Sequence, residues 1–339
     1  VRLIEQTSRD IKYMCLSHCW GSQHFIQTTK KMIIGFCNGI PWADLPQTFQ
    51  DAISVTYRLG LRHVWIDSLR IRQDDIEDWR REGGKMHHIY SRAYLTIAAS
   101  KAASADEGCF NRSKAHYSRK LNWSDGNFKY DIHVREIFQH ADLGTDGEGT
   151  LPLMHRGWVF QERLLSPRIV HFAPTELIWE CLEKSACECS RLSEFLIKSS
   201  IKKPIVIQDD LRPRSHGPSS QQHLWQEIVQ QYSKRQLTYQ KDIFPALQGI
   251  AKRIFGHTKI KYYAGLWEET FLQYMLWIAN ERTARPKIFR APSWSWASVG
   301  GGGVFWMTIS GDSYIELASV VSVCTTPVAK DSFGELVGA

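Results

Sequence analysis

Long apolar runs and blocks of basic residues are both missing from this chain of 339 residues. A membrane-spanning helix needs about 20 apolar residues in succession, so we expect no membrane span. Although the net charge is +7, no block of Lys and Arg is longer than three residues. Scattered charge of this kind favours solubility over a polyanion-binding surface, and we expect no nucleic-acid partner.

Common catalytic and nucleotide-binding sequence motifs are absent as well. The sequence has no G-x-S-x-G, which argues against a serine nucleophile elbow. The glycine run at 300–303 fits neither G-x-G-x-x-G nor the Walker frame. A phosphate-cradling glycine loop is therefore unsupported, and no internal repeat indicates a solenoid.

The eight cysteines lack the paired spacing of a zinc site. Cys187 and Cys189 form a C-x-C with Cys181 nearby, but no second pair accompanies them, so we expect no metal. No secretory signal opens the sequence, and most cysteines lie within apolar segments. This pattern predicts reduced thiols and a cytoplasmic protein.

What the sequence does contain is an alternation of apolar strands and amphipathic helices. Strands are expected at 12–17, 62–67 and 94–99, with helices at 48–59 and 75–90 between them. Such an order, with short connections, is typical of an α/β fold whose mostly parallel sheet carries helices on both faces.

The chain divides into three predicted parts. Residues 1–195 form a core domain with a variable insertion at 101–150, a helix at 155–165 and a hairpin at 168–180. Residues 196–222 are rich in Lys, Pro, Ser and Gln and are predicted to be a linker or mobile loop. Residues 223–339 are expected to pack on the core, β-rich after three helices at 224–237, 243–255 and 268–278.

Polar residues follow two of the predicted strands. Ligands of parallel sheets gather at the carboxyl ends of strands, which directs attention to the turn at 17–21 and to Asp67 with Ser68. The turn holds three candidates, Ser17, Trp20 and Gly21. Asp67 has a structural alternative, because a strand-end Asp often caps the next helix.

The segment 155–165 carries the most distinctive pair. Trp158 and Glu162 are four residues apart, so on a helix they stand on one face. A carboxyl beside an aromatic ring has a raised pKa and suits acid–base or charge-stabilising work, although a buried structural pair has the same pattern. Arg156 is a candidate to bind phosphate or to pair with Asp67. Glu82, on a helix face, is either a chemical group or a surface acid.

Three motifs resemble the heterokaryon incompatibility (HET) domain of filamentous fungi. They are LSHCWG at 16–21; LPQTFQDAI at 45–53 with LG at 59–60, VWIDSL at 64–69, QDD at 73–75, Trp79, Glu82, Met86 and IY at 89–90; and RGWVFQERLLSPR at 156–168. Segments at 232–247, 263–267 and 291–297 resemble the tail of many such proteins. One departure is Arg70, where the family usually has Cys.

The resemblance implies a role in fungal non-self recognition that ends in cell death. The HET domain is held to be distantly similar to TIR domains, some of which cleave NAD⁺ at the nicotinamide–ribose bond with a helix bearing Trp-x-x-x-Glu. It thus implies a TIR- or flavodoxin-like core with Glu162 as the key catalytic carboxylate, and the acids Asp67 and Glu82 are the further catalytic candidates. Substrate binding falls to Ser17, Trp20, Gly21, Ser68, Gln73, Arg156 and Trp158. NAD⁺ would be the substrate, with no cofactor required.

An alternative is a non-enzymatic module that signals death by self-association. In that case Arg156 pairs with Asp67 and the Trp residues serve packing. Because Arg70 stands where the family usually has Cys, a third alternative is that this chain is an inactive relative. Self-association on activation is expected in either case, together with a protein partner or upstream sensor that the sequence does not identify.

Overall fold

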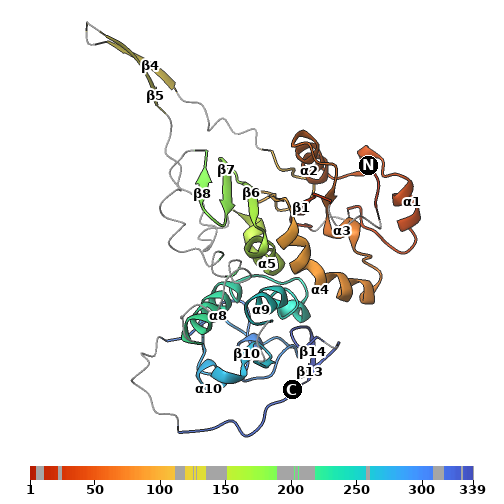
Figure 1. The fold of residues 1–339 in the computed structure, drawn as a ribbon, viewed down its shortest axis with the longest axis vertical. Helices are drawn as coiled ribbons and strands as arrows, with labels where there is room; N and C mark the ends of the chain where they lie inside the picture. The colour runs from red at the N-terminus through yellow and green to blue at the C-terminus, as the bar shows by residue number, and fades with distance from the viewer. Residues whose placement is uncertain are drawn as a thin grey trace.

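The computed structural model describes most of the chain (Figure 1). The described residues are 1–4, 11–21, 25–110, 119–124, 126, 128–134, 151–188, 202, 205, 218–256, 260–307, 317–329 and 331–338.

A six-stranded sheet forms the centre of the N-terminal half, in the order β2-β1-β3-β6-β7-β8. The strands β2, β1, β3 and β6 are parallel, whereas β7 and β8 add antiparallel at one edge. This confirms a mixed α/β fold with a mainly parallel sheet. The bounds are β1 Met14–Ser17, β2 Val64–Trp65, β3 Leu95–Ala98, β6 Arg168–Phe172, β7 Leu177–Cys181 and β8 Ser185–Cys187.

Helices cover both faces of this sheet. Because side chains alternate along a strand, Met14 and Leu16 of β1 pack with α2, while Cys15 between them packs with α4 and α5 on the other face. The helices of this half are α1 Ile33–Asn38, η1 Trp42–Asp44, α2 Gln47–Arg58, α3 Asp67–Arg70, α4 Ile76–Arg92, η3 Pro152–His155 and α5 Gly157–Leu165.

The strand predicted at 62–67 is shorter in the structure. Only Val64 and Trp65 pair with β1. Asp67 already begins α3, because its carboxylate accepts a hydrogen bond from the Ser68 N–H at 2.7 Å. By contrast, α4 begins as the sequence predicts, with Asp75 as its N-cap accepting from the Asp78 N–H at 3.3 Å.

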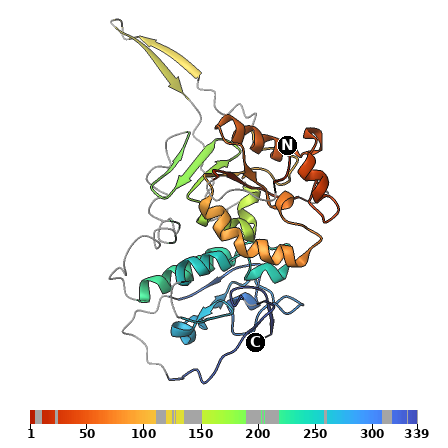
Figure 2. The ribbon, with the colours of Figure 1, turned by 45° about the vertical axis from the view of Figure 1, so that its right-hand side comes forward.

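The predicted insertion at 101–150 contains two different structures among its described residues. Residues 101–110 belong to the core, where Ala102, Ala105 and Cys109 are buried. Strands β4 (Arg119–Ser124) and β5 (Lys129–Val134) form a separate antiparallel hairpin that stands away from the body (Figures 1 and 2).

The C-terminal half packs on α4 and α5 through a shared apolar core (Figure 2). Four predictions need correction. Residues 218–222 of the predicted linker already belong to α8, which ends at Tyr232 and not at 237. The helix predicted at 243–255 begins at Gln248, and the one predicted at 268–278 is largely confined to 268–274. Much of 196–222 otherwise lies outside the described residues. The elements are α8 Pro218–Tyr232, η4 Gln240–Ile243, α9 Gln248–Phe255, β9 Tyr262–Tyr263, β10 Leu266–Trp267, η5 Glu268–Thr270, α10 Phe271–Tyr274, β11 Ile278–Ala279, η6 Trp296–Ser298, β12 Val304–Phe305, β13 Thr326–Pro327 and β14 Leu336–Gly338.

One glycine shows how tightly this half is packed. Gly265 has φ +92° and lies directly against the indole of Trp296, so a Cβ there would overlap the ring. Trp296 is fully buried. Among the described helices, none is both long and apolar enough to cross a membrane.

Candidate active site

The side chain of Glu162 lies at the carboxyl end of β1. The residue is only 5% exposed and sits on α5, which packs across β1. Burial raises the pKa of its carboxyl from 4.5 to about 7. The nearby hydroxyls of Ser17 and Tyr90 and the charge of Arg156 oppose this rise, whereas the charge of Asp67 adds to it.

Asp67 forms a half-buried acidic position beside this carboxyl. Its Oδ2 accepts a hydrogen bond from Trp20 Nε1 at 3.0 Å, and its Oδ1 lies 3.8 Å from His18 Nδ1. Burial lowers the pKa of His18 to about 4, so the imidazole is neutral near pH 7. Its ring instead meets Phe49 edge-on, with centroids 5.0 Å apart. His18 is therefore a packing residue that steadies the turn.

Arg156 enters the same region from the segment before α5. It is held in place by a backbone bridge to Gln236, and its guanidinium donates a hydrogen bond to the backbone carbonyl of His18. The ion pairs between described residues do not include one between Arg156 and Asp67. Its charge nevertheless lowers the pKa of Glu162, so the structure brings Asp67, Arg156 and Glu162 together at the turn after β1.

Two small residues are among the candidates, Gly21 in this turn and Ser68 in α3. Gly21 has φ +76°, and a Cβ there would lie 2.6 Å from the Ser104 Cβ, so both its conformation and the close approach favour glycine. Ser68 is fully buried, and its hydroxyl has no hydrogen-bond partner among the described residues. Arg70 lies half-buried in the last turn of α3, three residues beyond Asp67.

Three of the predicted site residues are directed elsewhere. Trp158 donates a hydrogen bond to Asp242 Oδ2 at 3.0 Å and meets Trp79 edge-on at 5.8 Å. Glu82 forms ion pairs with Lys85 at 2.9 Å and with Arg81 at 3.3 Å. Gln73 donates to the Ile71 carbonyl of its own loop at 3.0 Å. None of these contacts reaches Glu162.

Helix geometry explains why the side chains of Trp158 and Glu162 contact different elements although they lie on one face of α5. Helical side chains lean toward the N-terminus, so a side chain in the first turn of α5 covers what lies before the helix. For Trp158 that neighbour is Asp242 of the C-terminal half, whereas Glu162 in the middle of α5 meets β1.

The sequence reasoning missed Tyr90 as a site residue. Its hydroxyl contacts Glu162 and donates to the Leu16 carbonyl at 3.3 Å, and the side chain is buried. The available signal was its spacing on α4, four residues beyond Met86 and eight beyond Glu82. That spacing places all three on the buried face of one helix.

A second buried polar group supports α5 from its other side. Arg163 and Glu180 of β7 form a two-point ion pair, with N–O distances of 2.8 and 3.1 Å. His171 Nε2 lies 3.4 Å from the same carboxylate, and its Nδ1 lies 3.0 Å from the Ser100 hydroxyl. Ser100 and His171 are fully buried, so this network joins the helix to the sheet and is closed to substrate.

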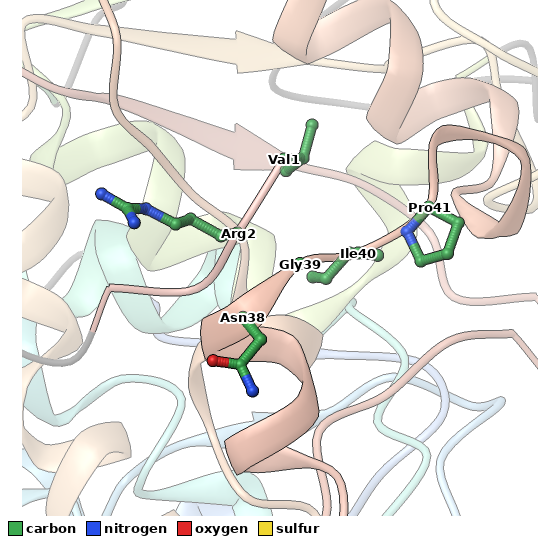
Figure 3. A pocket seen from close by; sticks show the side chains of 6 residues that line it. All are labelled: Val1, Arg2, Asn38, Gly39, Ile40 and Pro41. Carbon is green, nitrogen blue, oxygen red and sulfur yellow. The ribbon is translucent and has the colours of Figure 1, made fainter.

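Neither of two described hollows coincides with the Glu162 cluster. One, of about 540 Å³, is lined by Val1, Arg2 and residues 38–41, without a carboxylate or imidazole (Figure 3). The other, of about 520 Å³, lies in the C-terminal half beside Tyr262 and Phe333. In the described part of the chain, no three His, Cys, Asp or Glu residues are grouped to hold a metal ion.

The arrangement at Glu162 can stabilise positive charge near neutral pH. A carboxyl with a pKa near 7 is partly ionised there, and little water screens it. Asp67, Trp20 and Arg156 are half-buried and form the outer rim, while Glu162, Ser17 and Tyr90 form the base.

Comparison with known proteins places this cluster within one family. Residues 13–162 match the family model described as Heterokaryon incompatibility protein (HET), a span that contains Asp67, Arg156 and Glu162. No curated protein and no solved structure matches the chain. This match supports a heterokaryon incompatibility role and a fungal origin. Residues 13–162 of the chain are a heterokaryon incompatibility (HET) domain.

Proposed function

We propose that this HET domain is a cell-death effector that cleaves NAD⁺ between nicotinamide and ribose, with Glu162 as the essential carboxylate. The observation that supports this proposal most directly is the buried Glu162 carboxyl, whose pKa is raised to about 7, beside Asp67 and Arg156 at a strand end. The TIR-like character that the proposal assumes rests on the resemblance alone.

The chemistry suits one desolvated carboxylate. When the bond from ribose C1′ to nicotinamide breaks, nicotinamide leaves with the electron pair and the ribose becomes oxocarbenium-like. A neighbouring carboxylate stabilises that cation, as in glycoside hydrolysis. Water then adds to C1′ and releases a proton, giving ADP-ribose and free nicotinamide.

The rim residues have roles that follow from their present contacts. Arg156 uses part of its guanidinium on the His18 carbonyl, and the planar fork has further donors for a phosphate. Asp67 and Trp20 are joined by their 3.0 Å hydrogen bond and border the approach. Because Glu162 is only 5% exposed, substrate binding requires a local opening of the turn at 18–21.

Incubation of the purified protein with NAD⁺, followed by chromatographic detection of nicotinamide, tests this function. We expect Glu162→Gln to lower the rate by at least about 100-fold, the usual cost of losing one charge-stabilising group. Activity of the wild type should rise with pH through about 7 as Glu162 ionises. Glu183→Gln, which alters an exposed carboxylate in the β7–β8 turn, is the matched control and should cleave like the wild type.

Two results would overturn the proposal. One is the absence of nicotinamide at any pH between about 6 and 8, and the other is cleavage by Glu162→Gln at the wild-type rate. The slight exposure of Glu162 also favours a second candidate, a non-enzymatic module that signals by self-association. If folded Glu162→Gln protein still kills a fungal host cell, assembly rather than catalysis is the function. If the wild type neither cleaves nor kills, the chain is an inactive relative.

A further inference from the structure

The β4–β5 hairpin has one apolar face and one polar face. Its register places Leu121 opposite Ile132 and Trp123 opposite Tyr130. Since alternate side chains of a strand share a face, these four and Val134 lie on one side. The other side carries polar residues, among them Asn122, Ser124 and the ion pair of Lys120 with Asp131 at 2.9 Å.

The apolar face is open to solvent. Leu121, Trp123, Tyr130, Ile132 and Val134 are each 43–54% exposed, and Phe128 beside the turn is 64% exposed. The rings of Trp123 and Tyr130 lie against each other, with centroids 5.4 Å apart. Among the described strands, β4 and β5 pair only with one another, and the hairpin stands clear of the main sheet (Figures 1 and 2).

An exposed apolar face of this size is stabilised when another surface covers it. A two-stranded hairpin is at best marginally stable in water, and monomeric proteins seldom expose contiguous apolar patches larger than a few hundred Å². The exposed parts of these six side chains amount to roughly 600 Å², given the size of aromatic and branched side chains. Covering this area would stabilise the hairpin and remove the patch.

We propose that this face packs against the same face of a second copy of the chain. Two such faces would bury roughly 1,200 Å² in total, the lower end of a specific interface. Two flat β faces pack in layers as in a sandwich, and a two-fold axis lets one patch serve both copies. This inference is independent of the chemistry at Glu162.

The register sets one basic residue at the end of this face, because Arg119 pairs with Val134 and alternates with Leu121 and Trp123. The four central residues, Leu121, Trp123, Tyr130 and Ile132, carry no charge. An interface between proteins has such an apolar centre with a polar rim, and two copies related by a two-fold axis present the same arrangement to each other.

Sedimentation equilibrium of the full chain at concentrations up to about 100 µM tests the proposal. Trp123→Thr/Ile132→Thr keeps residues that favour strands but removes the central apolar pair. Asn122→Thr/Ser124→Thr makes two equivalent changes on the polar face. We expect a wild-type dimer, a dissociation constant raised at least about 100-fold in the apolar-face variant, and an unchanged constant in the control.

Folding is checked by thermal melting, because the hairpin lies outside the main core and neither variant should change the melting temperature of the body. A wild-type chain that remains monomeric at about 100 µM, or an apolar-face variant that dimerises as tightly as the wild type, overturns the proposal. So does a monomer that binds phosphatidylcholine–phosphatidylserine vesicles through Trp123 and Ile132, which would assign the face to a membrane.

Discussion

Replacing Glu162 with Gln should stabilise the folded protein above neutral pH. Burial raises the pKa of this carboxyl from 4.5 to about 7. Between these two values the folded protein holds a proton that the unfolded chain has already released, so the free energy of unfolding falls as pH rises. Below pH 4.5 the carboxyl is protonated in both the folded and the unfolded state. Above pH 7 the folded protein bears the full free-energy cost of burying the ionised carboxylate.

The size of the effect follows from the same two values. They differ by about 2.5 pH units, which at 1.36 kcal/mol per unit gives about 3 kcal/mol. Gln is neutral at every pH and avoids this cost. The variant should therefore match the wild type at about pH 4.5 and exceed its free energy of unfolding by about 3 kcal/mol at about pH 8.

Urea unfolding followed by tryptophan fluorescence measures this difference at the two pH values. The exposed carboxylate of Glu183 provides the matched control, since Glu183→Gln should change stability by less than about 0.5 kcal/mol at either pH. If Glu162→Gln is no more stable than the wild type at about pH 8, the carboxyl is not desolvated as the structure indicates. A variant that gains stability and loses NAD⁺ cleavage would show the trade-off that is common at active sites.

The packing around α5 gives three further predictions. Arg163→Ala should lower the free energy of unfolding by about 3–5 kcal/mol in urea titrations, because it removes the two-point cation from the buried Glu180 carboxylate and leaves, among the described residues, only His171 and Lys202 beside it; Arg163→Lys keeps the charge and should lose less, and an equal loss in both variants would contradict a charge-based cause. Gly249→Ala should cost about 1–3 kcal/mol, measured by thermal unfolding, because the added methyl overlaps side chains of α4 and α5; an unchanged melting temperature would show that α9 shifts freely. Trp158→Phe should lower stability by about 1–3 kcal/mol through loss of the hydrogen bond to Asp242 while keeping kcat for NAD⁺ cleavage, and a large fall in kcat would instead place the indole in the site.

Local sequence patterns predicted the central elements well, because burial on both faces leaves a clear signature. The apolar runs at 12–17 and 94–99 contain β1 and β3, whose residues are all buried. The hairpin at 168–180 is also confirmed, as β6 and β7. The helix predicted at 268–278 was wrong over its second half, where Ile278 pairs with Phe305 in a short sheet. That pairing joins residues far apart in the chain, and a local pattern does not contain it.

By itself, the sequence determined the α/β alternation, the family and the helix that carries Glu162, because periodicity and motifs are local properties. Only the tertiary structure decided which side chains meet there. Glu162, Ser17, Tyr90 and Asp67 come from four separate elements that the sheet order brings to one strand end. Trp158 has the expected spacing but contacts Asp242, 84 residues away. Spacing of four residues fixes a shared helix face, whereas the elements packed on that face decide what each side chain touches.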